Sequence, residues 1–311
     1  MVKVVVLGAS GMLGSMVLDY LCQDSSLQLA ATARGKDLLQ RLQTAYPKSV
    51  EWHLLDAERS SVQDIAGVLA DAEWVINAIG VIKPYIHDDN AAEAERAVLV
   101  NAYFPHLLAK AAEQNRCRVL QIATDCVYSG SKGRYVEKDN HDPLDVYGKT
   151  KSLGEVYSPK VNHLRCSIIG PEPKGHVSLL DWFLGQPRKG GVGGYTNHQW
   201  NGVTTLHFGK LCLGVVKERL TLPHVQHVVP SGAVSKAELL GCFAKGYKRE
   251  DITITPTEAK TVIDRTLDTS DESLNRRLWA AAGYPQPPSV PEMVAEMAQF
   301  TYRMAAKVVK S

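Results

Sequence analysis

The sequence lacks the features that mark secreted, membrane-spanning and nucleic-acid-binding proteins. Its 311 residues include only six cysteines, none of them in a Cys-x-x-Cys pair. Such scattered thiols are typical of reduced cysteines and argue against a disulfide framework. The 35 Lys and Arg nearly balance the 33 Asp and Glu, so no basic excess indicates a nucleic-acid partner. No apolar run approaches the roughly 20 residues of a membrane span.

These absences lead to expectations about location and metals. Residues 1–7 are too short and too rich in β-branched side chains for a signal peptide. We therefore expect a cytoplasmic protein with neither a membrane nor a nucleic acid as partner. His224 and His227 lie three residues apart on an expected strand, so they face opposite sides and cannot easily share a metal. We expect no metal site.

The first half of the chain alternates short apolar runs with amphipathic stretches. This alternation predicts right-handed βαβ crossovers and hence an α/β fold with a doubly wound parallel (Rossmann) sheet. The expected strands are 3–7, 27–33, 50–55, 74–79, 119–123 and 163–168. The expected helices are 12–22, 38–45, 62–69, 91–114 and 146–157.

The rhythm changes after residue 169, where loops rich in Gly and Pro begin. We expect residues 1–169 to form an NAD(P)-binding Rossmann domain that carries the catalytic residues. Residues 170–311 are expected to form mainly a smaller substrate-binding lobe, with about 203–230 returning to the first domain. Helices are expected at 206–216 and 291–304, and Pro291 suits a first helical turn.

A glycine-rich turn joins the first expected strand to the first helix. Gly8, Gly11 and Gly14 have the spacing G-x-x-G-x-x-G. Glycines here permit a tight turn and let a pyrophosphate approach backbone N–H groups at a helix N-terminus. The alternative is a purely structural turn that needs positive φ.

The end of the second expected strand bears on the choice of cofactor. NAD enzymes usually carry an acidic residue there, which binds the ribose 2′-hydroxyl. This sequence has Arg34 and Lys36 instead, and a guanidinium can pair with a 2′-phosphate. We therefore expect NADPH (NADP) as cofactor, with NADH as the alternative, in which Arg34 would only stack on adenine.

Tyr147 and Lys151 lie four residues apart and share one face of an expected helix. A nearby ammonium favours the phenolate, so we expect the pKa of Tyr147 to be lowered toward the working range of an acid–base catalyst. Thr124 follows the fifth strand and should face the same crevice.

These motifs together resemble a known family. The glycine turn, Thr124-Asp-Cys-Val-Tyr128, and Pro143-Leu-Asp-Val-Tyr-Gly-Lys-Thr-Lys-Ser-Leu-Gly-Glu155 are similar to extended short-chain dehydrogenase/reductases. The sequence most resembles the dTDP-4-dehydrorhamnose reductase family of sugar-nucleotide reductases. The resemblance is good over the first 170 residues and thins afterwards.

The resemblance implies an oxidoreductase in deoxysugar or surface-polysaccharide biosynthesis and assigns roles to residues. Tyr147 would protonate the carbonyl oxygen, Thr124 would hydrogen-bond that oxygen, and Lys151 would hold the nicotinamide ribose. The implied cofactor-binding residues are Gly8, Ser10, Gly11, Met12, Leu13, Gly14, Arg34, Asp56, Ala57, Ala78, Ile79, Gly80, Asn101, Tyr147 and Lys151.

Candidate substrate residues follow partly from departures from the family. Dehydratases of this kind carry Thr-Asp-Glu, whereas this chain has Asp125 followed by Cys126, which disfavours dehydration. Cys126 has no histidine beside it in sequence, so we interpret it as a packed residue near the substrate, not a nucleophile. Lys83 is either a sugar or phosphate contact or an exposed loop residue. Trp200 and Asn201, in a polar and aromatic loop, serve either the substrate or lobe packing.

The leading hypothesis is an NADPH-preferring reductase of a nucleotide-linked 4-keto-6-deoxy sugar, with a homodimer as one assembly to test. One alternative is a sugar-nucleotide epimerase that keeps its NAD bound. Another is a noncatalytic regulatory subunit with a reductase-like fold, because the β subunit of methionine adenosyltransferase resembles the same family. The retention of Thr124, Tyr147 and Lys151 argues against that last alternative.

Overall fold

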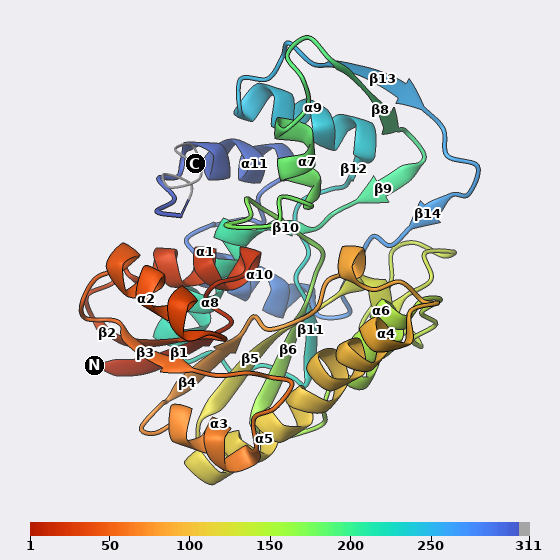
Figure 1. Ribbon diagram of the computed structural model, residues 1–311. Coiled ribbons are helices and arrows are strands. Elements are labelled where there is room, and N and C mark those ends of the chain that lie inside the picture. Colours follow the sequence, from red (N-terminus) through yellow and green to blue (C-terminus); the bar gives the residue numbers. More distant parts are fainter. Residues whose placement is uncertain (305–311) are drawn as a thin grey trace.

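Seven parallel strands form the central sheet of the protein (Figure 1), seen in a computed structural model that describes residues 1–304. Their hydrogen-bonded order is β11-β6-β5-β4-β1-β2-β3, and every neighbouring pair is parallel. The order reverses between β1 and β4, which confirms the doubly wound sheet and places a crevice at the carboxyl ends there. The strands are β1 (Val2–Leu7), β2 (Leu27–Ala33), β3 (Glu51–Leu54), β4 (Trp74–Asn77), β5 (Arg118–Ala123), β6 (Val161–Arg165) and β11 (Val225–His227).

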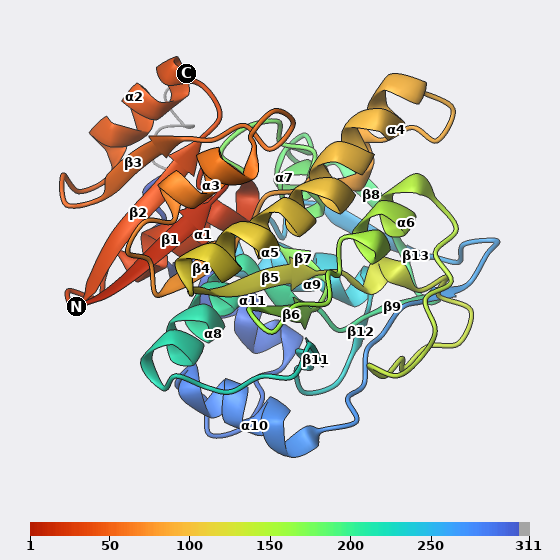
Figure 2. The ribbon, with the colours of Figure 1, turned by 90° about the horizontal axis from the view of Figure 1, so that it is seen from below.

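Helices cover both faces of this sheet. In β1, Val4 and Val6 belong to one hydrophobic core and Val5 and Leu7 to another, because successive side chains of a strand point to opposite faces. Figure 2 shows the second face from below, with α3 and α5 lying across it. The first face is covered by α1 (Met12–Leu21), α2 (Lys36–Ala45) and α8 (Thr205–Lys217), and the second by α3 (Val62–Val68), α5 (Phe104–Asn115) and α6 (Val146–Leu153).

The helix predicted at 91–114 is confirmed, because residues 91–115 are helical throughout, but its middle is a π-helical segment that the sequence did not predict. Pro105 has no N–H, and its ring disfavours a regular helical bond to the carbonyl of Asn101 four residues earlier. The chain widens into a π-helical turn around Asn101, an irregularity that often accompanies functional sites. The segments are α4 (Ala91–Ala97), η2 (Val98–Tyr103) and α5.

The smaller lobe lies above the carboxyl edge of the sheet (Figure 1). Its helices are α7 (Leu179–Leu184), α9 (Lys236–Gly246) and α11 (Val290–Gln299); Pro291 is in the first turn of α11, as expected, but this helix ends before 304. Its strand pairs are β8 (Gly191–Tyr195) with β13 (Thr253–Thr257), and β9 (His198–Trp200) with both β12 (Val234–Ser235) and β14 (Ile263–Asp264).

The chain crosses between the two parts more than once. Strand β7 (Ile168–Ile169) pairs with β10 (Val203–Thr204) at the junction. The expected strand at 163–168 had joined the start of β7 to β6. Helix α8 then packs on α1, and β11 joins the sheet beside β6. Helix α10 (Glu272–Ala281) packs on α8. Within residues 1–304, no helix is long and apolar enough to cross a membrane.

Candidate active site

The glycine turn after β1 needs glycine at two positions for different reasons. Gly8 has φ +77°, a conformation that other residues rarely adopt. A Cβ at Gly14 would lie 2.2 Å from the carbonyl oxygen of Gly8, so helix α1 can approach the turn only with glycine there. Gly11 is the N-cap of α1, and its N–H donates to Gly8 over 3.0 Å. The glycines thus leave the backbone open at three positions of the turn that leads into α1.

Thr124, Tyr147 and Lys151 meet at the carboxyl edge of the sheet. Thr124 follows β5, and its hydroxyl accepts a hydrogen bond from the N–H of Cys126 over 3.2 Å. Helix α6 carries Tyr147 and Lys151 and packs against this segment through Gly148, where a Cβ would lie 2.3 Å from the carbonyl oxygen of Cys126. The glycine beside Tyr147 therefore lets α6 come close to Thr124.

Burial sets the protonation of the two α6 side chains. It raises the pKa of Tyr147 well above its usual range, and Cys126 and Asp125 add to the rise while the Thr124 hydroxyl offsets part of it. The expected lowering by Lys151 is not seen, because desolvation dominates and the Lys151 ammonium donates to the carbonyl of Ile122 over 3.2 Å. Burial lowers the pKa of Lys151 to about 8. Tyr147 is thus held as a protonated phenol at neutral pH.

A single cavity of about 1140 Å³ contains both the glycine turn and the Thr124–Tyr147–Lys151 cluster. All the residues predicted to bind cofactor or substrate line it except Gly14, Asn101, Trp200 and Asn201. Among residues 1–304, the structure contains no group of three His, Cys, Asp or Glu side chains placed to hold a metal ion.

The four exceptions do not line the cavity themselves, although Val81 and Ser167, which two of them contact, do. Gly14 packs under the turn, and the Asn101 amide binds the backbone N–H and carbonyl of Val81 over 2.8 and 3.0 Å. The Trp200 indole N–H donates to the Ser167 hydroxyl over 2.9 Å. Asn201 exchanges two hydrogen bonds with the backbone of Leu267. Trp200 thus joins β9 to the segment between β6 and β7, and Asn201 joins two segments of the smaller lobe.

The candidate substrate residues near Thr124 differ in charge. Burial raises the pKa of the Cys126 thiol to about 12, so this cysteine is a neutral thiol. Burial also raises the pKa of Asp125, and nearby Arg265 and Lys236 oppose that rise. The Lys83 ammonium pairs with the carboxylate of Asp145 over 2.6 Å. Asp145 is the N-cap of α6, so Lys83 contacts the start of the helix that bears Tyr147.

Sequence reasoning missed a buried ion pair beneath the cluster. The Arg165 guanidinium, 1% exposed, binds the carboxylate of Glu155 with both Nε and Nη2. It also lies 2.7 Å from the Tyr128 hydroxyl and 2.7 Å from Nε2 of His227. An arginine within the expected strand 163–168 was the available signal, because a buried arginine requires a partner.

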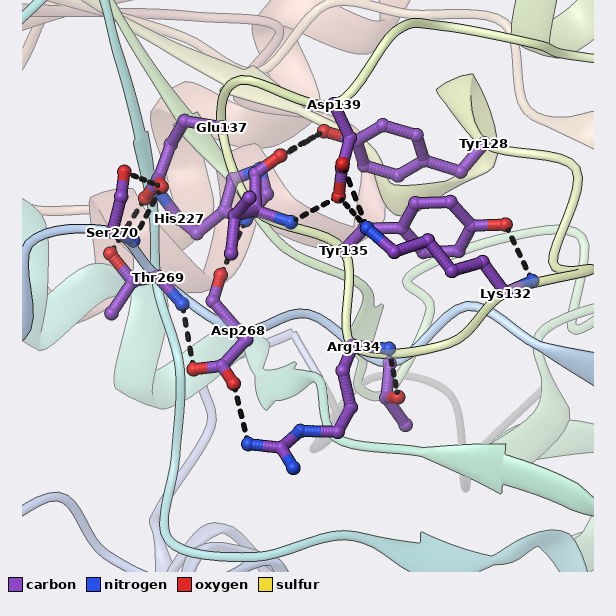
Figure 3. A network of polar contacts seen from close by, with 12 residues as sticks. Tyr128, Lys132, Arg134, Tyr135, Glu137, Asp139, His227, Asp268, Thr269 and Ser270 are labelled. Carbon is purple, nitrogen blue, oxygen red and sulfur yellow. Dashed lines mark hydrogen bonds and ion pairs between the residues drawn. The ribbon is translucent and has the colours of Figure 1, made fainter.

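A second polar network fixes the loop between β5 and α6 (Figure 3). The Glu137 carboxylate accepts hydrogen bonds from the N–H and hydroxyl of Ser270, from the Thr269 hydroxyl and from the N–H of His227. These bonds hold the pKa of Glu137 near 2 despite its burial. Tyr128 and Tyr135 stack with centroids 4.2 Å apart in the same network. The loop between β5 and α6 is thereby tied to the segment that precedes α10.

The fold and the site define the class: a Rossmann-type protein with a glycine turn and a Thr–Tyr–Lys cluster in one crevice. The chain belongs to the family described as the RmlD substrate binding domain, whose model matches residues 2–169. This confirms the family resemblance deduced from the motifs.

Curated relatives are similar over a little more than half of the chain. A dTDP-4-dehydrorhamnose reductase of Aggregatibacter actinomycetemcomitans is 29% identical over 180 residues, 55% of this chain and 55% of the relative. One from Mycolicibacterium smegmatis is 31% identical over 184 residues, 58% of this chain and 45% of the relative. The matched region spans about half the length of these relatives.

Solved structures are similar in fold along nearly the whole chain. A dTDP-4-dehydrorhamnose reductase from Bacillus anthracis in complex with NADP has a TM-score of 0.70 at 17% identity, covering 96% of this chain and 99% of that one. A UDP-glucuronic acid 4-epimerase from Bacillus cereus in complex with UDP-glucuronic acid and NAD has a TM-score of 0.72 at 16% identity, covering 98% and 99%. At these identities the likeness shows the fold alone.

Proposed function

We propose that the protein is an NADPH-preferring reductase of a nucleotide-linked 4-keto-6-deoxy sugar. The observation that carries the proposal is the single cavity that joins the glycine turn to the Thr124–Tyr147–Lys151 cluster. Family membership and the curated reductases support this reading.

The residues of the cavity fit a dinucleotide. A Cβ at Gly8 would lie 2.9 Å from Ile79, so the turn has no room for a side chain at this position. The first N–H groups of α1 have no acceptor within the helix, so they are free to donate to a diphosphate. Asp56 and Ala57 would lie beside the adenine. The nicotinamide would lie above Ala78, Ile79 and Gly80, and its ribose would contact Lys151. The cofactor, when bound, supplies the hydride.

The chain itself supplies orientation and a proton. The Tyr147 hydroxyl donates its proton to the sugar carbonyl oxygen, and the Thr124 hydroxyl donates a hydrogen bond to the same oxygen. The Tyr147 phenol keeps its proton at neutral pH, so it has a proton to donate in the direction of reduction. The neutral Cys126 thiol, where dehydratases carry glutamate, provides no carboxylate for water elimination.

The organisation of the chain belongs to the same proposal. Residues 1–169 would hold the cofactor and the catalytic groups, and most of 170–311 would bind the sugar nucleotide, with Lys83, Asp125 and Cys126 contacting the substrate. A cytoplasmic homodimer is the assembly to test, by light scattering of the purified protein.

A panel of dTDP-, UDP- and GDP-linked 4-keto sugars with NADPH and NADH tests the activity. We expect sugar-dependent loss of nicotinamide absorbance with at least one substrate, faster with NADPH. No oxidation of either cofactor with any sugar would contradict the reductase.

The epimerase alternative, which would share its fold with the UDP-glucuronic acid 4-epimerase from Bacillus cereus, makes a separate prediction. An epimerase recycles its NAD and would purify with the cofactor bound, whereas the proposed reductase would release it. The hypothesis of a noncatalytic subunit predicts no turnover with any substrate. Thr124, Tyr147 and Lys151 all line the cavity, which argues against this hypothesis.

A further inference from the structure

A group of cations lines the end of the cavity away from Tyr147. Arg34 and Lys36 follow β2, Arg41 lies in α2, and Arg96 lies in α4. Lys174 comes from the connection between β7 and α7, in the second half of the chain. Figure 1 shows this connection in green between the upper lobe and the red helices α1 and α2. The cations thus converge from distant parts of the sequence.

Lys174 interacts mainly with other positive groups. Burial is the largest cause of its lowered pKa, and the charged groups that lower it further are Arg34, Arg41 and Arg96. The Glu58 carboxylate bridges two of these, lying 3.3 Å from Arg34 Nη1 and 2.7 Å from Arg96 Nε. Asp37 and Asp56 also line this part of the cavity. Like charges gathered at one place favour an anion, because its binding removes their mutual repulsion.

The connection that carries Lys174 is held in place by its own contacts. The Glu172 carboxylate accepts the N–H groups of Val177 and Ser178 over 2.6 and 2.8 Å. Gly175 has φ +88°, and a Cβ there would lie 2.5 Å from the Tyr85 hydroxyl. The connection therefore packs against Tyr85, in the turn after β4, and brings Lys174 to the same cavity that the cations of the first part of the chain line.

We propose that Lys174 and Arg41 join Arg34 in binding the 2′-phosphate of the cofactor, so that phosphate recognition is assembled across the two parts of the chain. The proposal rests on the proposed function, whose expectation of NADPH depended on Arg34. An ammonium on the connection and two guanidinium groups on β2–α2 would surround one phosphomonoester. A phosphate dianion gains charge-assisted hydrogen bonds from each of them.

Two adenosine nucleotides that differ by the 2′-phosphate alone test this without any turnover. Binding of adenosine 2′,5′-bisphosphate and of adenosine 5′-monophosphate is measured by calorimetry for the full chain. We expect Lys174→Met to weaken the bisphosphate about ten-fold and to leave the monophosphate within about two-fold. Lys174→Arg should recover most of the loss, and the loss should shrink at high salt.

Matched variants identify what the result means. Lys260→Met removes one positive charge from an exposed site outside the cavity and should change neither affinity. Arg34→Ala gives the scale of a lost phosphate contact. If Lys174→Met leaves the bisphosphate unchanged, or weakens both nucleotides equally, the proposed role of Lys174 is wrong.

The same measurements separate this inference from the reductase. A bisphosphate preference that depends on Lys174, combined with no reduction of any sugar, would support the inference and contradict the proposed function. If the protein reduces a sugar but binds the two nucleotides equally, the result would support the proposed function and contradict the inference about Lys174.

Discussion

The Arg165 guanidinium and the Glu155 carboxylate form a buried ion pair that joins β6 to the end of helix α6. The Nε and Oε1 atoms are 3.0 Å apart, and the two side chains are 1% and 7% exposed. Glu155 lies one turn beyond Lys151 and is the charged group that opposes the lowering of the Lys151 pKa. The pair therefore supports the helix that carries Tyr147 and Lys151.

Arg165→Met should destabilise the fold strongly, because it leaves the Glu155 carboxylate buried without its cation. We expect the free energy of unfolding to fall by about 3–5 kcal/mol, measured by urea denaturation. Lys132→Met is the matched control: it breaks the exposed Lys132–Asp139 pair of Figure 3 and should change stability little. Equal losses in both variants would refute the special role of the buried pair.

Stability should fall in acid in two steps. Burial lowers the pKa of His163, His207 and His227 to about 4, so between pH 6.5 and 4 the unfolded chain binds more protons than the folded one. Stability therefore rises with pH across that window. Glu137, whose pKa is lowered to about 2, adds a second loss between about 4.5 and 2.

The pH dependence of the unfolding free energy, measured between pH 4 and 7, checks the first step. His163→Gln removes one titrating group while keeping a side-chain N–H for the Val156 carbonyl, and should flatten the slope. An unchanged slope would mean that His163 has the same pKa in the folded and unfolded chain, which would contradict its burial as a neutral imidazole.

Tyr147→Phe should reduce turnover about 10²–10⁴-fold, the usual loss for a positioned proton donor. The ring still fills its site, so the affinity for NADPH should be unchanged when measured by its fluorescence. A variant that kept full activity would rule out Tyr147 as the donor, and one that lost NADPH binding would point to a structural role.

Gly14→Ala should disrupt the turn after β1, because the new methyl group would lie 2.2 Å from the Gly8 carbonyl oxygen. We expect a loss of about 1–3 kcal/mol or more in unfolding free energy and weaker cofactor binding. Gly67→Ala, in α3 with no atom within 4 Å of the added Cβ, should instead stabilise the fold by about 0.5–1 kcal/mol. The thermal midpoints of the two variants should therefore move in opposite directions.

Sequence reasoning worked best where the signal was local. The apolar runs predicted the first six strands of the sheet to within a few residues, because strands covered on both faces carry continuous hydrophobic side chains. It predicted the helix at 91–114 but not the π-helical segment within it, where Pro105 and the close approach of Gly154 to the Asn101 carbonyl disturb the regular hydrogen bonds. Pro105, which lies within that pattern, was the available signal for this irregularity.

By itself the sequence determined the Rossmann sheet, the glycine turn and the spacing of Tyr147 and Lys151, because each depends on residues within one strand or one helix. Only the packed chain shows that burial raises the pKa of Tyr147, that Arg165 pairs with Glu155, and that Lys174 lines the same cavity as Arg34. These depend on desolvation and on charges brought together from distant segments. Desolvation and such contacts cannot be read from the order of residues, because they exist only once the chain has packed.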